Sequence, residues 1–305
     1  MDIKRISIFI LIIFASTSLQ AQHLSPSEIS ILKMKEDSMQ APAIKIIRGI
    51  NASDRFNADS AFTKTFVRAL SVPNSFYYPF DSLITISKLY APDSSFRIFT
   101  WQLVINENII RQHGAIQMNT PDGALKLFPL IDKSDVMKDP ADSIADNKGW
   151  MGAIYYKIIL NTYNGKKYYT LLGYDENNIR STRKIIEILQ FENNKPLFGA
   201  NIFSIPNQNV YTRNKVRYIM EFSKDASPTL NYDDDMKTIV MEHLISKTNE
   251  PNKKWTMVPD GDYEGFIWKN GYWVYENKIF NEITPEGKPP VPEPLQIPSK
   301  IPPKE

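Results

Sequence analysis

The chain has 305 residues, with 36 Lys and Arg against 34 Asp and Glu, and it contains no cysteine. The lack of cysteine excludes a disulfide-stapled miniprotein, an iron–sulfur protein, a Cys-ligated zinc site and a thiol enzyme. A net charge of +2 argues against a nucleic-acid-binding protein, which usually carries a basic stripe. With 42% hydrophobic residues, the chain has enough apolar side chains to bury a core of its own.

Residues 1–21 have the pattern of a secretory signal peptide. Lys4 and Arg5 supply a positive start, residues 6–14 form an apolar stretch, and Ala21 ends a small-residue cleavage site. The apolar stretch is too short to cross about 30 Å of hydrocarbon as a helix, so we expect cleavage rather than a membrane anchor. We therefore predict that the mature protein does not span a membrane and is exported to the periplasm or the exterior.

A helical segment is predicted at the start of the mature chain, over residues 22–53. Ser25 and Glu28 form a capping box, and Pro26 occupies the first helical position, where its missing N–H costs nothing. This pattern predicts a helix over residues 26–38.

A second helix is predicted directly after this segment. Phe62, Phe66 and Leu70 lie four residues apart and therefore share one helical face. Asp59 is its predicted N-cap, because a short acidic side chain can accept a hydrogen bond from the first turn.

From residue 81 onward the pattern changes to strands joined by tight turns. Asn164-Gly165 and Asn270-Gly271 predict the two clearest hairpins, because Asn-Gly suits the two positive-φ positions of a type I′ turn. The predicted strands cover residues 83–86, 96–105, 124–131, 153–160, 167–174, 184–191, 197–203, 216–222, 229–232, 237–244, 266–269 and 272–276. The sequence predicts an α+β, mainly β fold over residues 54–284, in which short N-terminal helices precede an antiparallel meander, either a barrel or a sandwich.

The end of the chain is rich in proline. Residues 285–305 hold eight of the 21 prolines, so neither a helix nor a sheet is expected there. We predict a disordered tail, and the alternative is a polyproline-type ligand for an aromatic groove.

Three alternating acidic residues form the first candidate for chemistry. Asp260, Asp262 and Glu264 share a face if their segment is extended, and paired carboxylates are the acid and base of glycoside hydrolysis. Gly261 and Gly265 instead favour a turn that leads into the second Asn-Gly hairpin. The turn is our prediction, and the catalytic interpretation is the alternative.

A second acidic cluster has two interpretations. Asp233, Asp234 and Asp235 offer the oxygen ligands that calcium prefers, but they lack the spacing of an EF-hand loop. Aspartate is also a preferred turn residue, and we predict a turn here. Because His113 and His243 have no second histidine at ligand spacing, we expect neither a metal nor a cofactor.

Aromatic residues cluster around the second Asn-Gly hairpin. We predict that they form cross-strand pairs that stabilise the hairpin. The alternative is that Trp268, Tyr272 and Trp273 are a platform on which a sugar stacks.

The dipeptide Asp-Ser followed by an apolar residue occurs four times in the chain. This pattern resembles the acceptor of the general O-glycosylation system of Bacteroidota, in which the hydroxyl after the aspartate is modified during export. The alternative is that Asp-Ser simply caps helices and begins turns. The candidate sites are Ser38, Ser60, Ser82 and Ser143.

Four segments carry a wider resemblance. Residues 75–82 (SFYYPFDS), 91–101 (APDSSFRIFTW), 167–178 (KYYTLLGYDENN) and 258–265 (VPDGDYEG) resemble a family of secreted Bacteroidota proteins with no assigned activity. The resemblance extends over about residues 54–281 and implies export. It implies no catalytic residue.

No coherent set of nucleophile, metal ligands or cofactor-binding residues is evident in the sequence. We therefore expect a non-catalytic protein of the cell envelope or the exterior, either a binding or a structural module, with an envelope protein or a glycan as its partner. The alternative is a carboxylate-dependent hydrolase that acts on an envelope glycan or polysaccharide. A third hypothesis, a calcium-stabilised adhesion module, depends on the cluster at residues 233–235.

Overall fold

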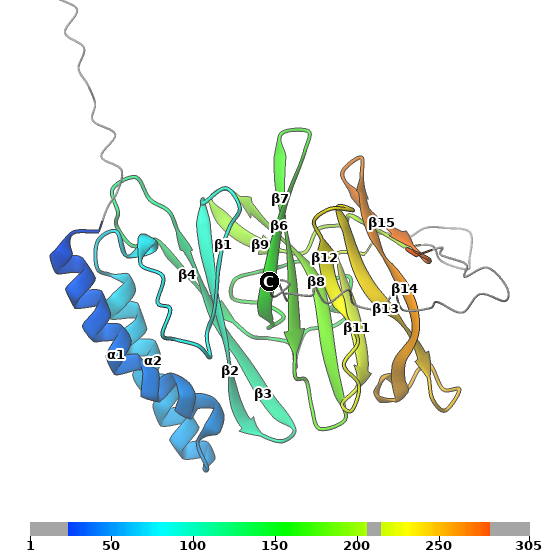
Figure 1. Cartoon of the computed structure of the whole chain (residues 1–305), viewed down its shortest axis with the longest axis horizontal. Coiled ribbons are helices and arrows are strands. Elements are labelled where there is room, and N and C mark those ends of the chain that lie inside the picture. Colours follow the sequence, from blue (N-terminus) through cyan, green and yellow to red (C-terminus); the bar gives the residue numbers. More distant parts are fainter. Residues whose placement is uncertain (1–23, 206–214, 281–305) are drawn as a thin grey trace, which may run out of the picture.

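The computed structural model describes residues 24–205 and 215–280 (Figure 1). The predicted signal peptide and the predicted proline-rich tail lie outside these residues. Two α-helices begin the described chain, and the strands that follow form three sheets, so the α+β, mainly β class is confirmed. In the part of the chain that the structure describes, no helix combines the length and the apolar character needed to cross a bilayer.

The first helix, α1 (Pro26–Arg48), begins at the predicted capping box. The Ser25 backbone N–H donates to Oε2 of Glu28 at 2.7 Å, and the Glu28 N–H donates to Oγ of Ser25 at 3.2 Å. The helix is ten residues longer than predicted and continues past Pro42. Its last turns bury Ala43 and Ile46, and this burial offsets the hydrogen bond lost at the proline.

The second helix, α2 (Ala52–Leu70), begins seven residues before Asp59, so the prediction of Asp59 as its N-cap is wrong. Asn51 occupies the cap position instead, and Asp59 lies buried in the middle of the helix. The predicted apolar face is confirmed, because Phe62, Phe66 and Leu70 are all buried. A short 3₁₀ turn (Ser75–Tyr77) follows.

The first sheet has four antiparallel strands in sequence order. Its third strand was not predicted, and the predicted strand at residues 83–86 is wrong. Leu83 and Ile86 close a turn, with the Ile86 N–H bonded to the Leu83 carbonyl at 3.2 Å, and both side chains are buried. The strands are β1 (Ser87–Tyr90), β2 (Phe96–Asn106), β3 (Ile109–Met118) and β4 (Leu127–Ile131).

The second sheet lies in the middle of the molecule (Figure 1). Its long strand β8 pairs with β7 along one side and with β11 and β9 along the other. The predicted strand at residues 184–191 is confirmed, because it lies within β8. Its strands are β5 (Ala145–Asp146), β6 (Ile154–Tyr163), β7 (Lys166–Asp175), β8 (Ser181–Glu192), β9 (Lys195–Phe198) and β11 (Arg217–Ser223).

The third sheet has the order β10-β15-β14-β13-β12. Its strands are antiparallel except at one edge, where β10 lies parallel to β15. A second 3₁₀ turn (Lys254–Thr256) precedes β14. The strands are β10 (Phe203–Ser204), β12 (Leu230–Asp233), β13 (Thr238–Ser246), β14 (Met257–Lys269) and β15 (Tyr272–Glu276).

Both predicted Asn-Gly turns are confirmed. Asn164 and Gly165 have φ values of 48° and 75°, and Asn270 and Gly271 have 50° and 85°. These turns join β6 to β7 and β14 to β15 as hairpins.

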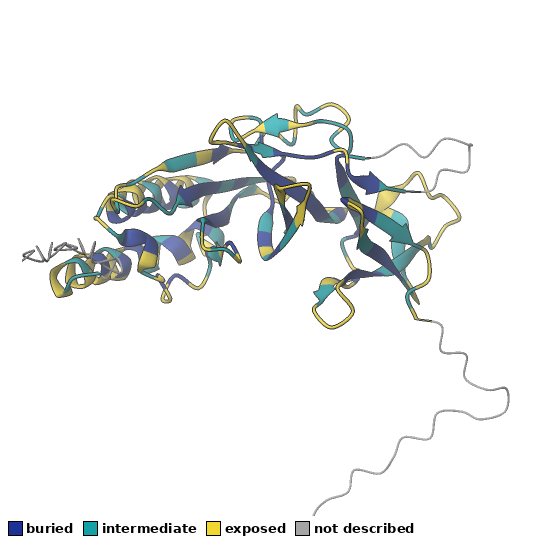
Figure 2. Cartoon of the chain, turned by 90° about the horizontal axis from the view of Figure 1, so that it is seen from above, coloured by how far each residue is buried: buried dark blue, intermediate teal, exposed yellow. Residues whose placement is uncertain are grey.

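The helices and the three sheets form successive layers with one apolar core between each neighbouring pair (Figures 1 and 2). Strand β2 shows how this works, because Phe99 and Trp101 face the helices while Phe96 and Ile98 face the second sheet. Strand β8 of the second sheet likewise faces the first sheet with one side and the third sheet with the other. No sheet closes on itself within residues 24–205 and 215–280, so the architecture is an open layered sandwich and not a barrel.

Candidate functional site

A cleft of about 640 Å³ lies between the second and third sheets. One wall is β6, the edge strand of the second sheet, and the other is formed by β12, β14 and the turn after β12. We call this the inter-sheet cleft and define it by Lys157, Asn161, Tyr232, Asp234 and Trp268. Its volume lies within the range of about 300–1,000 Å³ that is usual for small-ligand sites.

Two aromatic side chains lie in the wall formed by the third sheet. Trp268 is partly exposed and is supported by Tyr168 at 5.9 Å and Trp273 at 5.2 Å between ring centroids. Tyr232 is also partly exposed. Burial, together with the charges of Asp234 and Asp233, raises the pKa of Tyr232, so its hydroxyl remains a hydrogen-bond donor at neutral pH.

Polar groups face these rings from strand β6. Nζ of Lys157 lies 2.9 Å from Oδ2 of Asp234 and 5.8 Å from the centre of the Tyr232 ring. Oδ1 of Asn161 is buried and has no hydrogen-bond partner among the described residues. Rotation of this amide would give a ligand both a donor and an acceptor.

This combination of groups suits a carbohydrate. An aromatic ring can cover the apolar face of a sugar, while amide, ammonium and carboxylate groups hydrogen-bond to its hydroxyls. Asp234 is the one carboxylate among the residues that line the cleft, and it is paired with Lys157.

The three residues of the candidate aromatic platform lie in different surroundings. Trp273 is fully buried in the core between the second and third sheets, and its Nε1–H donates to Oγ1 of Thr170 at 2.9 Å. Trp273 lies opposite Trp268 in the hairpin, so the predicted cross-strand pairing is confirmed for these two residues. Tyr272 is 41% exposed at the end of the hairpin and does not line the cleft. Of the three candidates, only Trp268 reaches the cleft.

The three alternating carboxylates lie within strand β14, and the prediction of a turn at this position is wrong. Asp260 and Asp262 lie in a bulge opposite β13, where Gly261 has a φ of 96°. The extra residues of the bulge let the strand continue through a segment whose glycines and acidic side chains indicated a turn.

These carboxylates have separate roles. Asp260 binds Nδ1 of His243 at 2.8 Å; burial raises the pKa of Asp260, but the hydrogen bonds from His243 and the Asp262 N–H outweigh it and lower this pKa. Glu264 is buried and accepts hydrogen bonds from Tyr218 and Tyr275, while Asp262 is exposed. None of the three lines the inter-sheet cleft, so the candidate catalytic set is not assembled there.

The second acidic cluster forms the predicted turn. Oδ1 of Asp233 accepts the backbone N–H groups of Asp235 at 2.9 Å and Met236 at 2.8 Å, which is a typical use of aspartate in a turn. Within residues 24–205 and 215–280, no group of three or more His, Asp or Glu side chains is placed to hold a metal ion. Of the three aspartates, Asp234 lines the inter-sheet cleft.

The four candidate modification sites differ in accessibility. Ser38, Ser60 and Ser82 are exposed, whereas Ser143 is half-buried. Oγ of Ser143 donates to the carbonyl oxygens of Lys138 at 2.6 Å and of Asp139 at 3.1 Å. The first three are therefore better placed for modification of the folded protein.

No local sequence pattern indicates that Lys157, Asn161 or Tyr232 belongs to a site. They are separated from Trp268 along the chain and meet only because two sheets stack with their edges adjacent. In comparisons with known proteins, the chain matches no protein-family model, no curated protein and no solved structure. The assignment of the site rests on its geometry.

Proposed function

We propose that this protein is an exported, non-catalytic binding module of the bacterial cell envelope or exterior, and that the inter-sheet cleft binds a glycan. Export is supported by the signal-peptide pattern of residues 1–21 and by the resemblance to secreted Bacteroidota proteins. The observation that carries the binding proposal is the cleft itself. It places the Trp268 indole and the Tyr232 phenol opposite the polar groups of strand β6.

The proposal predicts retention of the protein by soluble polysaccharides. Affinity electrophoresis through gels that contain dextran, xylan, pectin or a peptidoglycan digest tests this directly. We expect slowed migration in at least one gel and normal migration of the Trp268→Ala variant in the same gel. Equal migration of the native protein in all gels and in a gel without polysaccharide would contradict glycan binding.

The hydrolase alternative makes a different prediction for the same polysaccharides. It requires the release of reducing ends, and this release should disappear in the Asp262→Asn and Glu264→Gln variants. We expect no release from the native protein, because these carboxylates lie outside the cleft. Release that depends on either residue would replace the binding proposal with the hydrolase.

We also propose that the exported protein carries O-glycans on exposed Asp-Ser sites. Ser38, Ser60 and Ser82 are exposed and are the preferred candidates. The intact mass of protein purified from its own host should exceed the mass of the cleaved chain, and the excess should survive denaturation. Replacement of these three serines by alanine should remove it, and an unmodified native mass would refute the proposal.

A further inference from the structure

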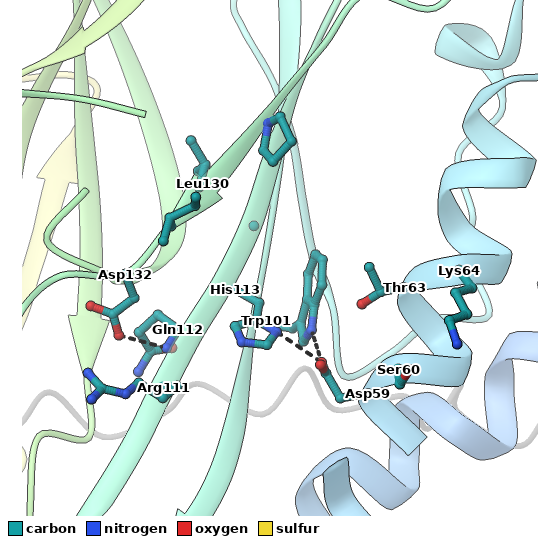
Figure 3. A pocket seen from close by; sticks show the side chains of 13 residues that line it. Asp59, Ser60, Thr63, Lys64, Trp101, Arg111, Gln112, His113, Leu130 and Asp132 are labelled. Atoms are coloured by element: carbon teal, nitrogen blue, oxygen red, sulfur yellow. Dashed lines mark hydrogen bonds and ion pairs between the residues drawn. The ribbon is translucent and has the colours of Figure 1, made fainter. Parts of the chain in front are cut away.

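A second pocket, of about 490 Å³, lies between helix α2 and strands β2–β4 (Figure 3). It shares no lining residue with the inter-sheet cleft. Trp101, Pro129 and Leu130 supply apolar surface, while Asp59 and His113 supply polar groups. The helical layer covers only part of the first sheet and leaves this recess beside the edge strand β4.

Hydrogen bonds at the polar centre of this pocket determine which ring nitrogen of His113 carries the hydrogen. Oδ1 of Asp59 accepts from Nε1 of Trp101 at 2.9 Å and lies 3.0 Å from Nδ1 of His113 (Figure 3). A carboxylate only accepts, so Nδ1 carries the hydrogen. In the neutral imidazole, Nε2 is then an acceptor with a free lone pair.

The Nε2 atom is available to a ligand. The His113 side chain is 33% exposed, and the hydrogen bond to Asp59 uses only Nδ1. Trp101 packs against the ring edge to face at a centroid distance of 5.9 Å and helps to hold its orientation. A ligand that enters the pocket therefore meets a positioned hydrogen-bond acceptor beside apolar surface.

The charges around the pocket balance. Lys64 on α2 and Arg111 on β3 are the cations, and Asp59 on α2 and Asp132, which directly follows β4, are the anions. Arg111 is also paired with Asp135 at 2.6 Å. The charges of the lining residues cancel and Arg111 is already paired with Asp135, so the pocket favours a neutral ligand over an anion.

We propose that this pocket binds a small neutral molecule that has an apolar body and a hydroxyl group. The hydroxyl donates to Nε2 of His113. The apolar body lies against Pro129, Leu130 and Trp101. This site is independent of the glycan proposed for the inter-sheet cleft.

Three probe molecules of nearly equal shape test the proposal by calorimetric titration at neutral pH. We expect 4-ethylphenol to bind about tenfold more tightly than 4-ethyltoluene, which lacks the hydroxyl. We expect 4-ethylbenzoate, which is an anion without a donor, to bind no better than 4-ethyltoluene. Equal binding of the phenol and the toluene, preference for the benzoate, or no binding of the phenol at millimolar concentration would each overturn the proposal.

One variant locates the effect and one serves as a control. His113→Phe should abolish the tenfold preference for the phenol, because it removes Nε2. Arg68→Ala changes an exposed cation of α2 that does not line the pocket, so it should leave phenol binding unchanged. Retention of the preference in His113→Phe would overturn the assignment, and the comparison of the phenol with the toluene in the native chain keeps the proposal falsifiable if this variant unfolds.

Discussion

At the scale of single residues, the most deeply buried charges are those of Arg217 on β11 and Glu187 on β8. Neither side chain has exposed surface, and Nε of Arg217 lies 2.8 Å from Oε1 of Glu187. The hydroxyl of Tyr155 donates to the other carboxylate oxygen, and Nη1 of Arg217 donates to the Ser143 carbonyl at 2.8 Å. The pair is stable because these additional hydrogen bonds replace the water that both groups have lost.

We predict that Arg217→Met lowers the free energy of unfolding by about 3–5 kcal/mol, because it leaves the Glu187 carboxylate buried without a counter-charge. The exposed pair of Lys269 and Glu276 is the matched control, and Lys269→Met should cost about 0–1 kcal/mol. Urea unfolding measures both. A cost for Arg217→Met as small as that of the control would show that the buried pair is not essential.

A second residue-scale prediction concerns acid stability. Burial raises the pKa of Asp93, but hydrogen bonds from Lys167, Ser95 and Tyr169 outweigh it and lower this pKa from 3.8 to about 2. Because the folded-state pKa lies below the unfolded one, the stabilisation is complete above pH 3.8 and is lost as the pH falls towards about 2. Asp93→Asn should therefore flatten the decline of the melting temperature across this interval. If the melting temperature of the Asp93→Asn variant falls as steeply with pH as that of the native chain, Asp93 does not cause the fall.

At the scale of elements, the two Asn-Gly hairpins have the same turn chemistry but different surroundings. A methyl group added at Gly165 meets no atom within 4 Å, whereas one added at Gly271 comes within 2.4 Å of the Tyr163 ring. Both glycines have positive φ, so an alanine carries a backbone cost at either position.

We predict that Gly165→Ala costs about 1 kcal/mol and that Gly271→Ala costs more, because the Tyr163 side chain must also move. Thermal unfolding of the two single variants and of each in a Tyr163→Ala background measures the difference. The excess at Gly271 should disappear in that background. If it persists, the extra cost does not come from the tyrosine.

Local sequence patterns predicted the elements whose structure depends on local chemistry. The capping box at Ser25 and both Asn-Gly turns are of this kind. Strand β3 was missed because it contains polar residues such as Gln112 and Gln117, which the fold accommodates through partners elsewhere in the chain. The Gln117 amide, for example, accepts from Nε of Arg97 at 2.8 Å.

The site could be predicted only in part for a related reason. Trp268 was chosen as an exposed aromatic side chain, and the structure places it in the cleft. Asp59 was interpreted as a helix cap because its partners, Trp101 and His113, are distant in sequence. No local pattern indicates which residues two stacked layers will bring together.

At the scale of the whole molecule, the layers explain where the two pockets lie. The first and second sheets bury both faces against their neighbours and the third sheet buries one, so little room for ligands remains within a core. The pockets occur where a layer ends, at the edges of β4 and β6. A glycan bound at the β6 edge would contact two sheets at once and should raise the melting temperature of the whole protein.

The most direct test of the central claim is calorimetric titration of the retained polysaccharide into three proteins. These are the native chain, Trp268→Ala in the cleft, and Trp255→Ala, which removes an exposed indole that does not line the cleft. The account predicts that Trp268→Ala weakens binding by at least about tenfold, because the stacking surface is lost, and that Trp255→Ala leaves it unchanged. Equal affinity of the native chain and Trp268→Ala would contradict the inter-sheet cleft as the glycan site.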